Sequence, residues 1–563
     1  MLVSNQNNKN IMKKITSIYI LTGLLTLGAV TSCKKDFLER PPLDQLSEAT
    51  FWKNPNDVYQ AVMAVYNQLP GDGTIYDDGA TDNAHAQYPW ESSATDVSAG
   101  TLTSTTDAGW SFIDIRRANY FLANADKVTT IDAALLERYK AEVRFLRAMF
   151  YYRLTNKFGD VPLITTVLAL GAENVPRTPK AEVVKFITDE LDAVSKILPQ
   201  NYAGGKPNEK GRITKGAALA LKARVHLNES QWQLAVDASS QVMTLGYSLF
   251  KVDAEEAIDA KDDYSKWVTF ANASDEKKFR LGLRSYEALF HKVNEGNAEV
   301  ILDRQQIDQK DANFLNTYLL PGTIGGWSSV TPTQELVNSY GSYKTGEAVT
   351  PTDPAQRAEW YKTNNPAFAN EYKNRDPRFY ASILFENSPW NAVEDDYKFN
   401  WVQGASNMSL TGYNFRKLVD PAIYRQQVDN HANIILIRYA EVLLTYAEAK
   451  NELSGPDATV YDALDAVRTR SGMPVVDRVK YAGKDALREV IRNERRVELA
   501  LEGQRYMDIR RWKIAPQVMK TINNIKNTQA QERTWNDRFY LMPVPQKEVD
   551  LSKGVLTQNA GYN

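Results

Sequence analysis

The chain has 563 residues but contains one cysteine, Cys33, and only four histidines. A single cysteine excludes a disulfide within the chain, so stability must come from burial and hydrogen bonding. The histidines are too scattered for an HExxH motif or another paired-ligand spacing, and we expect no metal site from them (His85, His226, His291 and His431). A G-x-S-x-G elbow and a glycine-rich phosphate loop are also missing, so we expect neither a catalytic serine nor a bound cofactor.

The chain also lacks an excess of either charge and a long hydrophobic run. Its 67 basic side chains nearly balance 69 acidic ones, which gives no field that would attract nucleic acid. The one apolar stretch, residues 15–30, is interrupted by hydroxyl side chains and is shorter than the roughly 20 residues that a membrane-spanning helix needs.

That apolar stretch has the layout of a secretory signal peptide. It follows Lys13 and Lys14, and it ends in the small residues Thr31 and Ser32 before Cys33. The end resembles a bacterial lipoprotein box, which predicts cleavage before Cys33 and a lipid anchor on its thiol. Residues 1–11 carry no signal character, so we expect translation to start at Met12. An ordinary signal peptide with an incidental cysteine is the alternative.

Apolar side chains recur with a helical period of 3.6 residues in several segments. The predicted helices include residues 55–69, 139–154, 183–198, 215–227, 232–245, 438–453, 460–470 and 486–512. The tight succession of 215–227 and 232–245, with small residues at the contact positions, is typical of a tetratricopeptide-like helix hairpin. We therefore predict an all-α-dominated fold, with scaffold helices at about 50–70, 112–250 and 432–515.

Two regions lack such periodicity. Residues 70–110 are rich in Gly, Asp, Ser and Thr and are predicted to be a long loop. Residues 296–430 accumulate Gly, Pro, Asn and Trp and are predicted to form a loop-rich insert with a few short strands, such as Glu299–Leu302. Another strand-like piece is expected near Tyr540–Pro543. We predict that residues 34–563 form a single domain.

Several motifs occur in the order found in one known family. They are Asp36–Glu39, Pro41-Pro42, Phe51-Trp52, Ala141–Ala148, Phe158–Leu163, Gly211–Lys215, Ala220–Leu227, Arg438–Leu444, Tyr446–Ala449, Asn493–Arg496, Glu498, Glu502-Gly503, Arg505, Asp508, Arg510–Trp512, Pro543–Pro545 and Gln558-Asn559. In these motifs the chain resembles the SusD/RagB family of nutrient-binding outer-membrane lipoproteins.

The resemblance implies an α-superhelix of tetratricopeptide-like hairpins with a loop-rich ligand face. It implies binding of an oligosaccharide, less often a peptide, without cleavage. It also implies docking on a TonB-dependent (SusC-like) outer-membrane transporter, with the protein anchored by lipid and facing the cell exterior.

Glu494, Glu498 and Glu502 share one face of a predicted helix at i, i+4 spacing. Paired carboxylates can indicate a glycosidase. Because arginines interleave with these glutamates and would hold them ionised, we interpret them as a structural ion-pair network. In the 70–110 loop, Asp72, Asp77, Asp78 and Asp82 crowd together without EF-hand spacing, so a solvated loop is expected and a calcium site is the alternative.

Aromatic residues outside the helices are the candidate ligand-binding groups, because sugar rings stack on flat aromatic faces. They are Trp90, Trp110, Tyr318, Trp327, Tyr340, Trp360, Tyr361, Trp390 and Trp401. Any one of these could instead hold its loop in place. Trp327, in the permissive turn Gly325-Gly326-Trp327-Ser328, also matches a sugar-lining tryptophan of the family.

We predict that Trp327 stacks on the sugar, that Tyr318 and Trp90 flank it, and that Asn83 or Asp96 bonds hydroxyl groups. The family's starch binder has tryptophans in the first long loop, whereas Ser98–Thr106 has none, which favours another glycan over starch. Peptide or glycopeptide capture, a surface glycoside hydrolase and a protein-binding scaffold are the alternatives.

Overall fold

The computed structural model describes residues 51–169, 171–172, 174–202, 209–426 and 428–562. The predicted signal peptide and Cys33 lie outside the described residues. The described chain divides into two compact units, residues 51–59 with 127–131 and residues 60–126 with 132–562. Helix α2 (Pro55–Tyr66) begins in the smaller unit, where the Asn54 side chain accepts a hydrogen bond from the N–H of Asn56 (2.9 Å) and caps the helix. The remaining α-helices and the strands belong to the larger unit.

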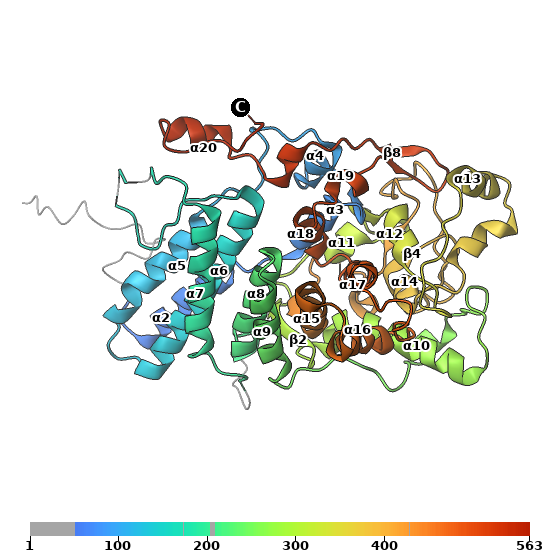
Figure 1. Ribbon diagram of the computed structural model, residues 1–563, viewed down its shortest axis with the longest axis horizontal. Helices are drawn as coiled ribbons and strands as arrows, with labels where there is room; N and C mark the ends of the chain where they lie inside the picture. Colours follow the sequence, from blue (N-terminus) through green and yellow to red (C-terminus); the bar gives the residue numbers. More distant parts are fainter. Residues whose placement is uncertain (1–50, 170, 173, 203–208, 427, 563) are drawn as a thin grey trace, which may run out of the picture. The chain divides into compact units, whose positions relative to one another are not determined.

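A row of helices forms the scaffold of the larger unit (Figure 1). Its members are α5 (Ile113–Asn124), α6 (Ala133–Phe158), α7 (Lys180–Ser195), α8 (Lys215–Asn228), α9 (Trp232–Met243), α15 (Tyr439–Ser454), α16 (Ala458–Arg470) and α17 (Lys484–Glu498). Each helix packs against the next from α5 to α16, and α17 packs on α15. Three-residue links join α8 to α9 and α15 to α16 into hairpins. The predicted tetratricopeptide-like, mainly helical fold is confirmed.

The helices begin where a side chain satisfies their free N–H groups. Asp132 accepts from the N–H of Leu135 at the start of α6 (2.8 Å), and the Thr214 hydroxyl accepts from the N–H of Ala217 at the start of α8 (3.2 Å). Asp457 does the same for α16. The caps place the starts of α8 and α16 within two residues of the predicted positions, whereas α6 begins six residues earlier than predicted.

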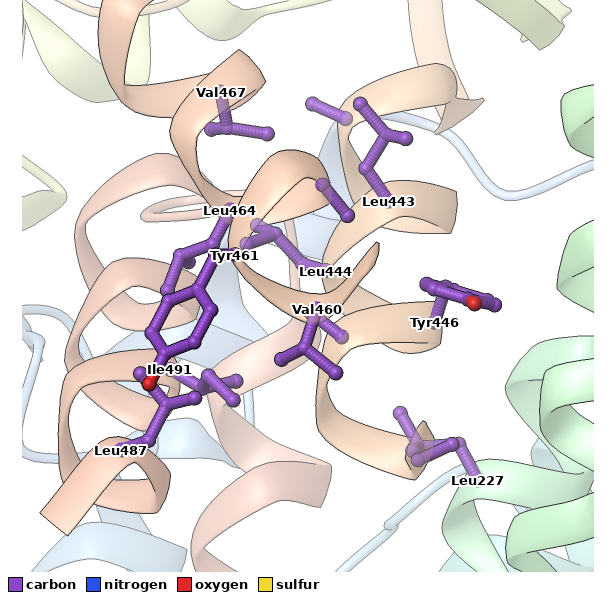
Figure 2. Packing of buried hydrophobic residues seen from close by; sticks show 14 of the residues in the cluster. Leu227, Leu443, Leu444, Tyr446, Val460, Tyr461, Leu464, Val467, Leu487 and Ile491 are labelled. Atoms are coloured by element: carbon purple, nitrogen blue, oxygen red, sulfur yellow. The ribbon is translucent and has the colours of Figure 1, made fainter. Parts of the chain in front are cut away.

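The core of the array lies where α15 meets α16, α17 and the α8–α9 hairpin (Figure 2). It is built from the buried side chains Leu227, Leu443, Leu444, Tyr446, Val460, Tyr461, Leu464, Val467, Leu487 and Ile491. Burying one such aliphatic side chain contributes roughly 1.5–3 kcal/mol. The apolar stripes that predict the helices are therefore the surfaces that hold them together.

A network of buried ion pairs joins the array to the loop-rich part of the chain. Glu498 lies at its centre and accepts hydrogen bonds from Arg438 (Nη1–Oε1 2.6 Å), from Arg378 (Nη1–Oε2 2.8 Å) and from Arg470. Arg438 also pairs with Glu502 (Nε–Oε2 2.7 Å). Although burial alone raises the pKa of the Glu498 carboxyl, the three guanidinium groups outweigh it and hold that pKa well below its ordinary value. The predicted structural role of this glutamate series is confirmed.

Short strands form four two-stranded antiparallel sheets in the residues that the structure describes. They are β1 (Ala84–Ala86) with β3 (Val330–Pro332), β2 (Val300–Arg304) with β6 (Ile434–Arg438), β4 (Ile383–Leu384) with β5 (Asn414–Phe415), and β7 (Ile522–Asn523) with β8 (Gln529–Gln531). Strand β2 lies where a strand is predicted. Its pairing with β6 returns the chain to the start of α15.

The regions predicted as loops contain many short elements. Residues 70–110 hold α3 (Ile75–Gly79), β1 and α4 (Ala94–Ala99). The loop-rich insert holds α11 (Leu315–Leu319), α12 (Gln334–Ser339), α13 (Pro354–Lys362) and α14 (Pro377–Ser382). Just before the insert, α10 (Ala273–Glu287) is a helix that the prediction missed.

The single helix predicted for residues 486–512 is wrong. The chain forms α17, then a turn, then α18 (Gln504–Arg511), because Leu501 and Gly503 adopt left-handed conformations (φ 66° and 73°).

The strand expected near Tyr540–Pro543 is also absent from the described chain, which has a short 3-10 helix over Asp537–Tyr540 and later the helix α20 (Gln546–Leu551). Helix α19 (Ala515–Val518) completes the set. No helix in the described ranges is long and apolar enough to cross a membrane.

Candidate functional site

The pairing of β1 with β3 brings two distant loops together. Ala86 lies opposite Val330, and just beyond them the N–H of Gln87 donates to the carbonyl oxygen of Ser329 (2.8 Å). Residues that follow β1 therefore lie beside residues that precede β3. The segment after β1 carries Trp90 and the segment before β3 carries Trp327, two of the aromatic residues predicted to bind ligand.

Both tryptophans are exposed to solvent. Trp90 is 77% exposed and stacks on Tyr88, with ring centroids 4.9 Å apart and planes at 28°. Trp327 is 45% exposed, and its carbonyl oxygen accepts a hydrogen bond from the Tyr88 hydroxyl (3.1 Å). Tyr88 therefore supports one ring by stacking and joins its loop to the loop that carries the other.

A tight hairpin displays Trp327. The N–H of Trp327 donates to the carbonyl oxygen of Thr317 (2.7 Å), and the N–H of Ser328 donates to that of Leu320 (3.0 Å). Gly326 passes so close to Leu320 that a Cβ atom would lie 1.9 Å from its carbonyl oxygen. Only glycine fits there, and the neighbouring Gly325 adopts the left-handed region (φ 90°).

Tyr318 and Phe314 add two further rings from the start of this hairpin. Phe314 is 39% exposed and lies 6.0 Å from the half-buried Tyr318 ring, which meets Tyr76 edge to face at 5.7 Å. The Tyr76 hydroxyl donates to Glu91 (2.6 Å), and Glu91 accepts a second bond from the Ser329 hydroxyl (3.0 Å). The ring contact of Tyr318 with Tyr76, and the hydrogen bonds of Glu91, thus connect these rings to both loops. We call Tyr88, Trp90, Phe314, Tyr318 and Trp327 the aromatic platform.

A third loop, residues 402–410, closes against the platform. The carbonyl oxygen of Asn407 accepts from the Ser328 hydroxyl (2.7 Å), and its side-chain oxygen lies 3.4 Å from the Tyr88 hydroxyl. The N–H of Leu410 donates to the Gln87 side chain (3.2 Å). Trp401 anchors the loop, since its ring is buried and its Nε1–H donates to the carbonyl oxygen of Ser409 (2.8 Å).

The structure therefore brings Trp327, Trp90 and Tyr318 together, whereas Asn83 is not available to a ligand. Asn83 is fully buried, its amide donates to Asp78 (3.0 Å), and its side-chain oxygen accepts from Arg496 (2.7 Å). The prediction for Asn83 is wrong because its partner, 413 residues away, draws it into the interior.

Asp96 lies in α4, where its carboxylate accepts a hydrogen bond from the Thr101 hydroxyl (3.0 Å). Within the described residues we find no contact between Asp96 and the platform rings. Its role as a hydroxyl-binding residue stays a prediction.

Sequence reasoning missed Tyr88, Phe314 and Asn407. For Tyr88 a signal existed, since Tyr88-Pro89-Trp90 places two rings beside a proline in an irregular segment. Phe314 and Asn407 gave none, because their importance comes only from the other loops that meet them. Trp390 and Tyr340, in contrast, are fully buried and belong to the core.

The aspartates of the 70–110 loop diverge rather than converge. Asp72 accepts from the N–H of Phe314 (2.8 Å), Asp77 pairs with Lys157 (3.7 Å), Asp78 accepts from the N–H of Gly503 (2.8 Å), and Asp82 pairs with Arg505 (2.8 Å). In the part of the chain that the structure describes, no group of three or more His, Cys, Asp or Glu side chains is placed to hold a metal ion.

Comparisons with known proteins agree with this architecture. A family model described as the SusD family matches residues 287–562, and one described as "Starch-binding associating with outer membrane" matches residues 36–227. A solved structure of a SusD-like protein from Bacteroides fragilis NCTC 9343 is 30% identical, with 93% of this chain and 100% of that chain covered and a TM-score of 0.76. The chain belongs to the SusD family.

Other SusD relatives match over nearly the same length. A SusD-like carbohydrate binding protein from the same Bacteroides fragilis strain is 26% identical, with 90% of this chain and 99% of that chain covered and a TM-score of 0.72. SusD-like protein P25 of Formosa agariphila is 24% identical over 97% of this chain and 98% of its own. The description of the second family model and the name of this Bacteroides fragilis relative both indicate a carbohydrate-binding family associated with the outer membrane.

Proposed function

We propose that this SusD-family protein captures oligosaccharides on the aromatic platform without cleaving them and passes them to a TonB-dependent, SusC-like transporter. In this proposal the chain is anchored in the outer membrane through lipid on Cys33 and faces the cell exterior. The observation that carries the proposal is the display of Trp327 and Trp90 on adjoining loops with their rings in solvent. The carbohydrate-binding relative of similar fold supports it.

The platform has the physical properties that a sugar needs. The C–H faces of a pyranose ring are apolar and stack on aromatic faces, while its hydroxyl groups need hydrogen-bonding partners at the edge. The side-chain amides of Gln87 and Asn407 lie beside the rings and can supply such partners. A cluster of exposed aromatic rings also leaves apolar surface in contact with water, and such patches commonly mark a binding site.

The state of the glutamate carboxylates also favours ligand binding over hydrolysis. Glu494, Glu498 and Glu502, the candidate pair for hydrolysis, are held by arginine and lysine partners rather than free beside the rings. A ligand that must be handed to a transporter should dissociate quickly, and modest affinity gives fast dissociation. A platform of rings on loops fits this requirement better than a deep pocket.

The test is binding of the chain from Lys34 onward to a panel of oligosaccharides and peptides, comparing the native protein with Trp327→Ala. We expect one class of oligosaccharide to bind and Trp327→Ala to weaken it at least tenfold, about 1.4 kcal/mol. Trp360→Ala is the matched control, because Trp360 is a partly exposed tryptophan on α13. It should bind like the native chain.

Other outcomes would contradict the proposal in different ways. Equal binding by Trp327→Ala would remove the platform as the site. Binding of peptides alone would favour peptide capture on the same scaffold, and release of sugar products would favour a hydrolase. Binding of proteins but no small ligand would favour an interaction scaffold.

A further inference from the structure

The three segments that build the aromatic platform share an unusual composition. Three runs of the sequence contain neither lysine nor arginine. They are the 62 residues between Lys53 and Arg116, the 33 between Lys310 and Lys344, and the 17 between Lys398 and Arg416. The chain as a whole has 67 basic residues in 563, a frequency that would place about 13 in these 112 positions. The platform loops 87–91, 314–329 and 402–410 all lie inside these runs.

The runs do contain acidic residues, and two of them flank the platform. Asp72 accepts from the N–H of Phe314 (2.8 Å), and Glu91 accepts from the Tyr76 and Ser329 hydroxyl groups. Burial, and then the negative charges of Asp72 and Glu91, raise the pKa of Tyr318, so both carboxylates act on this platform ring. Neither carboxylate forms an ion pair with any residue that the structure describes.

Lys526 reaches the loop 402–410, where it donates to the Gln403 side chain (3.2 Å) and lies over the buried Trp401 ring rather than over a platform ring. The arginines that approach the segment around β1 have partners in the interior. Arg496, Arg505 and Arg533 reach the segment around β1 from the interior, where they bind Asp82 and the carbonyl oxygens of Thr81 and Ala84. All three arginines are buried or nearly so. Their guanidinium groups are therefore occupied by partners inside the molecule.

Arg304 is the basic residue near Asp72, since its guanidinium lies beside Gly71. It pairs with Asp311 (3.2 Å) and donates to the carbonyl oxygen of Leu69 (2.8 Å). Many rings elsewhere in the molecule have a cation over one face, for example Trp390 with Arg416. Within the described chain, none of the five platform rings has one.

We infer that the platform accepts uncharged glycans and rejects glycans that carry sulfate or carboxylate groups. An anionic sugar on these rings would meet two carboxylates and, in the described chain, no cation over any of the rings, whereas binding of sulfate or carboxylate normally uses arginine or lysine. Like charges a few ångströms apart in water repel measurably, and this repulsion is screened by salt with a length of about 8 Å at physiological ionic strength. The inference rests on the proposed function and names its ligand class.

The test compares glycans that share a backbone and differ in charge. We would measure binding of the chain from Lys34 onward to laminarin and sulfated laminarin, to neutral and sulfated galactan oligosaccharides, and to soluble starch and carboxymethyl starch. In every pair that binds, we expect the neutral member to bind roughly tenfold or more tightly at 50 mM salt. The difference should shrink at 1 M salt, where charges are screened within about 3 Å.

Two variants locate the effect. Asp72→Asn removes one negative charge while its amide oxygen can still accept from Phe314, and it should raise the affinity for the anionic member several-fold relative to that for the neutral member. Asp477→Asn is the matched control, because Asp477 is an exposed residue whose carboxylate likewise accepts backbone N–H groups. It should change neither affinity.

Tighter binding of a sulfated or carboxylated member, weakened by salt, would overturn the inference and leave glycan capture standing. An unchanged preference in Asp72→Asn would also overturn it, since the rejection would then not come from the platform charges. If no glycan of any pair bound and peptides did, the proposed function itself would fail.

Discussion

The hydroxyl group of Tyr88 donates a hydrogen bond to the carbonyl oxygen of Trp327 over 3.1 Å, although the two residues are 239 positions apart in the chain. The same tyrosine stacks on Trp90. One side chain thus holds two exposed tryptophans in a fixed relation, and such pre-arrangement reduces the entropy lost when a ligand binds.

Tyr88→Phe tests this arrangement. The ring remains to support Trp90, but the bond to the Trp327 loop is lost. We expect glycan affinity to fall about three- to tenfold, while the free energy of unfolding changes by only about 1 kcal/mol. Calorimetric titration and urea unfolding would measure the two effects. The control is Tyr481→Phe, because Tyr481 lies in the turn between α16 and α17 and its hydroxyl bonds Glu347. Unchanged affinity in Tyr88→Phe would show that the loops hold their positions without this bond.

Gly326→Ala should distort the hairpin that displays Trp327. The added Cβ would lie 1.9 Å from the carbonyl oxygen of Leu320, so the backbone must move. We expect binding to be lost and the unfolding temperature to fall by several degrees. Gly483→Ala is the control, because a Cβ there meets nothing within 4 Å. Native-like binding by Gly326→Ala would mean that the hairpin tolerates displacement.

Glu498→Gln should strongly destabilise the protein. Removing this charge leaves three buried arginines, Arg378, Arg438 and Arg470, without their shared partner. Breaking a buried ion pair in this way costs about 3–5 kcal/mol. Glu489→Gln on the same helix removes an exposed carboxylate that pairs with Arg492 and should cost less than about 1 kcal/mol. Denaturant unfolding of both variants would reveal the difference, and equal stability would contradict the central role of Glu498.

The stability of the fold should decrease in acid partly through Glu287. Burial raises the pKa of this carboxyl, but Arg416 and Arg284 outweigh burial and lower it to about 2 from an ordinary value of 4.5. A lowered carboxyl pKa contributes stability above pH 4.5 that is lost as the pH falls towards 2.

Between pH 6 and pH 3 this single group should account for about 2 kcal/mol of unfolding free energy. In Glu287→Gln the change in stability over that range should be smaller by this amount, whereas Glu489→Gln should behave as the native chain does. Urea unfolding at the two pH values measures it. An identical pH dependence in Glu287→Gln would show that the carboxyl is already protonated or unpaired.

The scaffold was predictable from sequence because its helices are marked by patterns among residues that are close together in the chain. The apolar stripes of α6, α8, α9 and α15 repeat over three or more turns, and the helix starts follow from capping residues such as Thr214. The break between α17 and α18 was missed because the apolar spacing continues across it. Gly503 was the available signal, whereas the left-handed conformation of Leu501 is imposed by the fold around it.

The site was only partly predictable because it is built by contacts between residues that are far apart in the chain. Trp327 was identified from its glycine-rich turn, and Trp90 from its irregular surroundings. That they adjoin follows from the register of β1 and β3, two strands of three residues that are too short to show a period. The burial of Asn83 depends on Arg496, which no local pattern could reveal.

The helical row passes directly from α9 to α15, although α9 ends at Met243 and α15 begins at Tyr439. The 195 residues between them leave and re-enter the row at one point, and they carry two of the three platform loops. Changes confined to those two loops need not disturb the stacking of the hairpins, whereas a change at Arg378, in the same stretch, would break a buried ion pair with Glu498. Sequence changes that alter ligand choice can therefore be confined to the platform loops, while the helical array keeps its packing.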